Sequence, residues 1–170
     1  MAKVEIVLDT DVIIHFAKAD CLSLLPTIFP EYHMVVLSTV CDELKGEIRN
    51  QLDNMILLLK NIEKKTFNPT KEMMLEYARL KLRFGEGESA CMAYCRYTNN
   101  VIGSSNLNDI KAYCEENQLI YLTTIDFLYY AIKKRRMTIE QAHTFLRIVQ
   151  AKGSILPLID FNTFVSPVIV

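Results

Sequence analysis

Residues 4–8 read Val-Glu-Ile-Val-Leu and lead directly into Asp9, Thr10 and Asp11. The run is short, mostly apolar and rich in β-branched residues, which is typical of a strand buried on both faces of a parallel sheet. Asp9 then lies at the carboxyl end of that strand. Apolar residues recur at helical spacing through residues 11–19, so the chain is predicted to turn from strand to helix, with Thr10 or Asp11 as the N-cap.

The same alternation of strand and helix repeats along the chain. Asn68-Pro69 and Gly85 interrupt the helical patterns, and Ser38 is the expected N-cap of the helix after the second strand. Further strands are predicted at residues 33–37, 101–104 and 119–122, and further helices at residues 38–44, 47–59, 70–84, 89–97, 108–116, 125–135 and 138–151. Strands that alternate with helices predict an α/β domain with a central parallel sheet of about four or five strands.

The bulk composition suits one folded domain. The chain has 170 residues, 51% of them hydrophobic, and a formal net charge of -1 from 19 basic and 20 acidic residues. A balanced charge gives no overall attraction to phosphate, so any contact with nucleic acid must be local. We expect a domain at residues 1–155 and an extended C-terminal segment at residues 156–170 that packs on the body of the domain or on a partner.

The sequence also predicts the cellular compartment. Charged residues near the N-terminus argue against a signal peptide, and no run reaches the ~20 apolar residues of a membrane-spanning helix. We therefore expect a cytoplasmic protein that does not enter a membrane. The five cysteines include no Cys-x-x-Cys pair, which is consistent with reduced, mostly buried thiols.

Three acidic residues fall where a site is expected. Asp9 follows the first strand, Glu43 lies on the helix after the second, and Glu88 opens the helix before the third. In open parallel sheets, sites form outside the carboxyl ends of the strands. Carboxylates gathered there repel one another unless a cation neutralises them. Mg²⁺ or Mn²⁺ is the expected cation, because both prefer oxygen ligands.

These segments together resemble the PIN (PilT N-terminal) nuclease family, and most closely its VapC-like and related bacterial branches. The resemblance rests on residues 7–14, 38–44, 85–90 and 151–153, and it covers nearly the whole chain. It implies a single three-layer PIN-like domain with helices flanking the sheet. It also implies that Asp9, Glu43 and Glu88 hold the catalytic metal of a ribonuclease.

One departure from the family pattern concerns the fourth acid. PIN nucleases usually carry an Asp just after the third strand, whereas Ser104, Ser105 and Asn106 occupy that place here. Ser105 or Asn106 can bond to a metal-bound water but brings no charge. Asp109 lies one helical turn further on, about 5 Å along the axis, and is a candidate substitute. Asp11 is either a supporting acid or part of the helix cap.

A basic run provides the candidate contact with nucleic acid. Lys133, Lys134, Arg135 and Arg136 end a predicted helix. Basic residues complement the negative pole of a helix, so the run is either a solvated helix terminus or a patch that contacts phosphate.

The resemblance favours a metal-dependent endoribonuclease of the kind found in toxin-antitoxin pairs, with single-stranded RNA as substrate. It further implies a homodimer and inhibition by an antitoxin protein. The alternative is a PIN-like module that binds nucleic acid or a protein after losing turnover, which Ser105 in place of the usual acid would explain. An Asp-x-Asp strand end also resembles phosphatases of the haloacid dehalogenase type, but these continue with Gly-Thr, whereas Val12-Ile13 stands here.

Overall fold

Strand β1 (Glu5–Leu8) lies at the centre of a five-stranded parallel sheet in the computed structural model, which describes residues 4–170. The strand order is β3-β2-β1-β4-β5, and every neighbouring pair is parallel. The other strands are β2 (His33–Leu37), β3 (Glu63–Lys65), β4 (Val101–Gly103) and β5 (Tyr121–Leu122). The predicted α/β class is confirmed, and the sheet has the upper of the two expected strand numbers.

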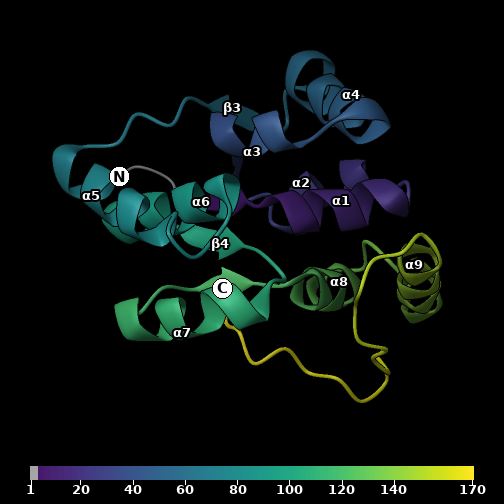
Figure 1. The fold of residues 1–170 in the computed structure, drawn as a ribbon. Helices are drawn as coiled ribbons and strands as arrows, with labels where there is room; N and C mark the ends of the chain where they lie inside the picture. The colour runs from purple at the N-terminus through teal and green to yellow at the C-terminus, as the bar shows by residue number, and fades with distance from the viewer. Residues whose placement is uncertain (1–3) are drawn as a thin grey trace.

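Helices cover both faces of the sheet and complete the three predicted layers. In Figure 1, α5, α6 and α7 lie on the left of the sheet, and α1, α2, α8 and α9 lie on the right. The bounds are α1 (Thr10–Lys18), the 3-10 turn η1 (Leu22–Leu24), α2 (Leu25–Ile28), α3 (Ser38–Glu43), α4 (Gly46–Asn54), the π-helical turn η2 (Met55–Leu59), α5 (Lys71–Leu80), α6 (Glu86–Thr98), α7 (Leu107–Asn117), α8 (Thr124–Lys133) and α9 (Ile139–Ala151). None of the helices within residues 4–170 combines the length and the apolar character needed to cross a bilayer.

The order of connections creates a switch point between β1 and β4. The chain leaves β1 through α1, which packs on one face, and leaves β4 through α7, which packs with α6 on the other. Leu8 is in register with Gly103, and the Asp9 N–H donates to the Gly103 carbonyl at 2.8 Å. A crevice is expected where neighbouring strands send their helices to opposite faces, so this is where a ligand fits.

The core lies on both sides of the three inner strands. Apolar residues of β1, β2 and β4 are buried, as continuous apolar runs in a parallel sheet require. On the side of α1, α8 and α9, four phenylalanines pack edge to face, with Phe16 contacting Phe127 and Phe145, and Phe29 contacting Phe127. Such pairs each add about 1 kcal/mol beyond the area that they bury.

Three local predictions were wrong. Asp9, not Thr10 or Asp11, is the N-cap of α1, because its side chain accepts the Thr10 N–H at 2.7 Å. Ser38 does not cap α3: its hydroxyl accepts the Phe67 N–H at 3.1 Å and ties the loop after β3 to the helix. The helix predicted over residues 47–59 ends at Asn54 and continues as the π-helical turn.

The C-terminal segment lies along the domain in an extended conformation. Leu156 and Phe161 are buried, and Ser166 donates to Asp126 at 2.6 Å. The Tyr130 hydroxyl donates to the Val168 carbonyl at 2.6 Å. In Figure 1 the segment runs from α9 along the lower edge of the molecule and ends beside α7.

Candidate functional site

An acidic pocket opens at the switch point. It has a volume of about 330 Å³ and collects side chains from the ends of β1 and α3 and from the starts of α6 and α7. Asp9, Thr10, Asp11, Ile14, Glu43, Gly85, Glu88, Asn106 and Asp109 line it. The three acids that the sequence singled out, Asp9, Glu43 and Glu88, therefore share one pocket, together with Asp11, Asn106 and Asp109.

Asp9 is the most enclosed acid of the pocket. Its exposure is 5%, and burial raises its pKa from 3.8 to about 7. The charge of Asp11 adds to the rise, while the Thr10 N–H and the Ser104 hydroxyl, which bond to the ionised form, oppose it. Because a helix cap needs only an oxygen, the position of Asp9 also suits Asn, but only Asp brings a charge into the pocket.

Glu88 has an oxygen with no protein partner. It lies in the first turn of α6 and is 8% exposed, and its Oε1 is enclosed without a hydrogen bond. Burial raises its pKa from 4.5 to about 8, and the charges of Asp9, Asp109 and Asp11 add to the rise. An enclosed carboxylate oxygen without a donor is costly, so this atom calls for a bound proton or a cation.

Glu43 is fixed by two neighbouring elements. Its Oε1 accepts the Gly87 N–H at 2.7 Å, and its Oε2 accepts the Thr10 hydroxyl at 2.7 Å. These bonds join the end of α3 to the starts of α6 and α1. Each carboxylate oxygen retains a second lone pair, so Glu43 positions the pocket and still presents negative charge to it.

Asp11 begins a chain of hydrogen bonds that runs away from the pocket. Its Oδ2 accepts the Ser105 N–H at 2.7 Å. The Ser105 hydroxyl donates to Thr124 Oγ1 at 2.8 Å and accepts the Thr124 N–H at 2.7 Å. Thr124 Oγ1 is also 2.8 Å from His15 Nδ1. Burial raises the pKa of Asp11 to about 6, and burial lowers that of His15 to about 4.

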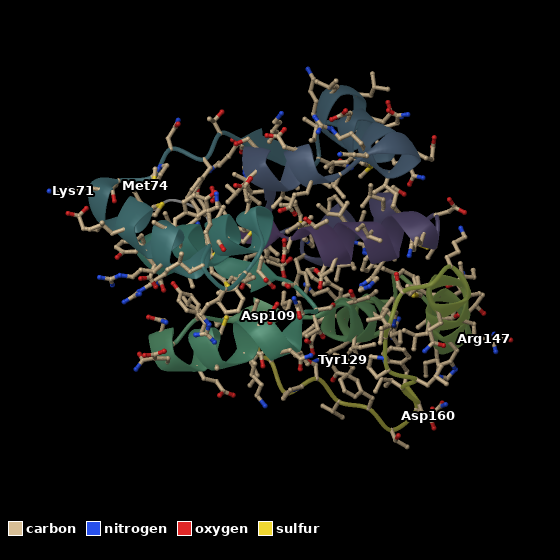
Figure 2. All side chains as sticks on the ribbon, in the orientation of Figure 1. Lys71, Met74, Asp109, Tyr129, Arg147 and Asp160 are labelled. Carbon is tan, nitrogen blue, oxygen red and sulfur yellow. The ribbon has the colours of Figure 1, made fainter. Side chains whose placement is uncertain are left out.

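Asp109 lies in the first turn of α7 and lines the pocket. Its Oδ2 accepts the Asn106 amide at 2.7 Å, and its hydrogen bond with Glu88 contributes to the raised pKa of that residue. In Figure 2, Asp109 is labelled at the end of α7 nearest the middle of the molecule, beneath α6. The start of α7 therefore brings one charged residue, Asp109, to the acidic pocket beside the neutral Asn106.

The basic run lies elsewhere. Thr124, at the start of α8, contacts the residues beside the acidic pocket, whereas Lys134, just past its end, pairs with Glu31 at 2.5 Å, two residues before β2 begins. The ten residues of α8 separate these ends by about 15 Å. Lys133 lies over the rings of Tyr129 and Tyr130. The run Lys133–Arg136 is thus at the amino ends of the strands, away from the acids.

Several site residues escaped the sequence reasoning. Thr10 and Gly87 hold Glu43, and Ser104 bonds to Asp9. A Cβ at Gly87 would meet Glu43 Oε2 at 2.7 Å, so a side chain there would displace the Glu43 carboxylate. The register offered a signal for Ser104: it follows β4 as Asp9 follows β1, so the two residues must be neighbours.

The donors of the pocket are chemically suited to a hard divalent cation. They are carboxylate and amide oxygens, the ligands that Mg²⁺ and Mn²⁺ prefer, and Glu88 Oε1 lacks any other partner. Within residues 4–170, no three His, Cys, Asp or Glu side chains are already arranged to hold one metal ion. A cation here would draw on fewer direct protein ligands, with its own waters bonded to the remaining acids.

The comparisons with known proteins give no assignment. No protein-family model matches the chain. No curated protein matches it either.

Proposed function

We propose that the chain is a metal-dependent endoribonuclease that acts through the acidic pocket and resembles PIN toxins in its chemistry. The observation that supports this most directly is Glu88, a buried carboxylate with a partnerless oxygen, in the same pocket as Asp9 and Asp109. With a purely structural role, these acids could relieve their mutual repulsion only by staying protonated. The location of the pocket outside the carboxyl ends of β1 and β4 adds support.

Asp9 and Glu88 are the proposed direct ligands of Mg²⁺ or Mn²⁺. Mg²⁺ keeps several waters and is commonly bound by one or two carboxylates, so this pair is sufficient. Asp11, Glu43 and Asp109 would bond to the waters of the ion and supply charge. Glu43 has a second task, because its bonds to Thr10 and Gly87 fix the walls of the pocket.

When bound, the ion lowers the pKa of a water and neutralises charge on the phosphoryl oxygens. The protein residues do the rest. Glu43, which Thr10 and Gly87 hold in place, would orient a water of the ion toward the phosphate. The one hydroxyl on the lining, that of Thr10, donates to Glu43, so the proposed attacking group is a water rather than a side chain.

The proposed experiment measures Mn²⁺ binding and cleavage of single-stranded RNA in the same preparations. Asp9→Asn keeps the helix cap and Glu88→Gln keeps the shape, and both should lower cleavage at least about 100-fold and weaken Mn²⁺ binding. Asp42→Asn is the matched control, because Asp42 is exposed and adjacent to Glu43 but does not line the pocket. Cleavage that persists in both site variants, or that needs no divalent ion, would refute the proposal.

A second function, a binding module without turnover, is favoured by one observation. Ser105 stands near the place of the usual fourth acid and uses its hydroxyl on Thr124 rather than on the pocket. The same experiment separates the two functions, since a module would bind RNA in the presence of Mn²⁺ without cutting it.

A further inference from the structure

A second pocket adjoins the acidic one and is chemically different from it. Its volume is about 450 Å³, and it shares Asp11 and Asn106 with the acidic pocket. The rest of its lining comes from α1, from the loop before α7 and the start of that helix, and from the loop after α9: His15, Ser105, Leu107, Asn108 and Ile155. The two pockets therefore meet at Asp11 and Asn106, where a single ligand can reach both.

The lining predicts a neutral ligand. Asp11 is the one charged side chain among the lining residues, and its sign repels phosphate. Asn106 and Asn108 each offer an amide donor and an amide acceptor. Leu107 is partly exposed and Ile155 is 98% exposed, so two aliphatic side chains present apolar surface at the same place. Hydrogen-bonding edges combined with apolar surface suit a flat heterocycle rather than an anion.

His15 contributes a ring nitrogen without a protein partner to the lining of this pocket. The side chain is 6% exposed, yet it lines the pocket. Its Nδ1 is bonded to Thr124, whereas Nε2 has no hydrogen-bond partner within residues 4–170 and is not among the enclosed polar atoms. Because Ser105 donates to Thr124 Oγ1, the Thr124 hydroxyl is left to donate to Nδ1, and the neutral ring carries its proton on Nε2.

We infer that this second pocket binds one unpaired nucleobase, with His15 Nε2 and the Asn106 and Asn108 amides reading its edge. The identification of the ligand as part of an RNA substrate rests on the proposed function. The base in the second pocket and the phosphate in the acidic pocket would belong to the same nucleotide. A base inside a duplex is stacked and its pairing edge is occupied, so the pocket selects single strands or bases turned out of a helix.

Direct binding tests the inference without any cleavage. Adenosine, guanosine, cytidine and uridine are titrated separately into the metal-free protein in EDTA, with ribose 5-phosphate as a probe that lacks a base. We expect at least one nucleoside to shift the NMR signals of the His15 ring and of the Asn106 and Asn108 amides, and ribose 5-phosphate to leave them unchanged. Absence of these shifts at millimolar nucleoside, or equal shifts with ribose 5-phosphate, would overturn the inference.

A matched pair of variants tests the residues. Asn108→Ala should weaken nucleoside binding roughly fivefold, the effect of one hydrogen bond, and should flatten the base preference of RNA cleavage. Asn50→Ala is the control, because both residues are exposed helical asparagines for which no side-chain hydrogen bond is found within residues 4–170. Equal affinity of the two variants would contradict the assignment of Asn108.

The inference and the proposed function fail separately. Nucleoside shifts at His15 in a protein that cuts no RNA would refute the nuclease and leave the base pocket standing. RNA cleavage by a protein whose His15 and Asn108 signals ignore nucleosides would refute the base pocket and leave the nuclease standing.

Discussion

Glu43 accepts the backbone N–H of Gly87 at 2.7 Å, a bond that joins the last residue of α3 to the first turn of α6. Forty-four residues of chain separate the two positions. In its present position the Glu43 carboxylate leaves no room for a side chain at residue 87, because a Cβ there would lie 2.7 Å from Glu43 Oε2 and 2.9 Å from Cδ. The glycine thus sets how closely α6 approaches α3, and with it the depth of Glu88 in the pocket.

Gly87→Ala should therefore displace Glu43 and open the acidic pocket. We expect a change of at most about 1 kcal/mol in the free energy of unfolding, because the flexible Glu43 side chain can move aside, and at least tenfold weaker Mn²⁺ binding. Gly85→Ala is the control, because its Cβ would meet Glu43 Oε1 at an ordinary 3.8 Å. Chemical denaturation and calorimetric titration of both variants measure the difference. Equal behaviour of the two would show that the close approach at Gly87 is unimportant.

The buried acids should make the metal-free protein less stable as the pH rises. The pKa values of Asp9 and Glu88 in the folded protein are about 7 and 8, above the 3.8 and 4.5 expected when unfolded. Between these limits the folded state binds more protons than the unfolded state, so the free energy of unfolding falls from about pH 4 to about pH 8. The cost of ionisation is absent below pH 4 and fully present above pH 8.

The substitution Glu88→Gln should remove most of the contribution that Glu88 makes to the fall of the free energy of unfolding with rising pH. We expect the variant to be more stable than the parent at pH 8, by on the order of 1–3 kcal/mol, and similar to it at pH 4. Thermal unfolding in EDTA at both pH values gives the comparison, and the difference between the two proteins isolates Glu88 from other titrating groups. A parent protein that gains stability relative to Glu88→Gln as the pH rises would contradict the sign.

Asp109 provides a test of whether a further carboxylate contributes to the proposed metal site. Asp109→Asn removes one charge from the pocket while keeping the size of the side chain, so Mn²⁺ affinity should fall about 10-fold or more. Glu116→Gln is the control on the same helix, because Glu116 is exposed and does not line the pocket. Calorimetric titration with Mn²⁺ measures both. Unchanged affinity in Asp109→Asn would mean that the pocket works without a fourth acid.

The sheet and the gathering of the acids were accessible from the sequence for one physical reason. Parallel strands buried on both faces are continuous apolar runs, and their carboxyl ends meet at one edge. Asp9 could be located at that edge from residues 4–8 alone. The edge strand β3 was missed because it reads Glu63-Lys64-Lys65, and an exposed edge strand needs backbone pairing but no apolar pattern.

The hydrogen bonds within the site were not accessible. By residue type, Asp9 and Thr10 are both acceptable N-caps of α1, and Ser38 is an acceptable N-cap of α3. Tertiary contacts decide which of them act as caps: the Thr10 hydroxyl bonds to Glu43 instead, and the Ser38 hydroxyl accepts the Phe67 N–H instead. Nothing in the sequence indicated that the Glu43 carboxylate accepts two hydrogen bonds whereas Glu88 Oε1 accepts none.

The position of the basic run could have been foreseen and was not. A helix that follows a parallel strand runs back along the sheet, so its C-terminal residues lie at the amino ends of the strands. Lys133–Arg136 had to lie far from Asp9 once residues 119–122 were assigned to a strand and the next helix was allowed to pack against the sheet. The pairing of Lys134 with Glu31 is the observed consequence.

That geometry leads to a prediction about RNA affinity. Lys133→Gln combined with Arg135→Gln should leave the binding of a short single-stranded RNA within about twofold of the parent, because the length of α8, about 15 Å, separates these charges from the end of the helix that lies beside the acidic pocket. Arg83→Gln should weaken binding and reduce the salt slope by about 1, because Arg83 is exposed and lies two residues before Gly85, which lines that pocket. Fluorescence anisotropy at several salt concentrations, with Ca²⁺ in place of Mn²⁺ to prevent cutting, measures both. A larger effect of the double variant than of Arg83→Gln would mean that RNA is held at the amino ends of the β-strands. The acidic pocket would then have to act on an RNA molecule that extends across the whole sheet.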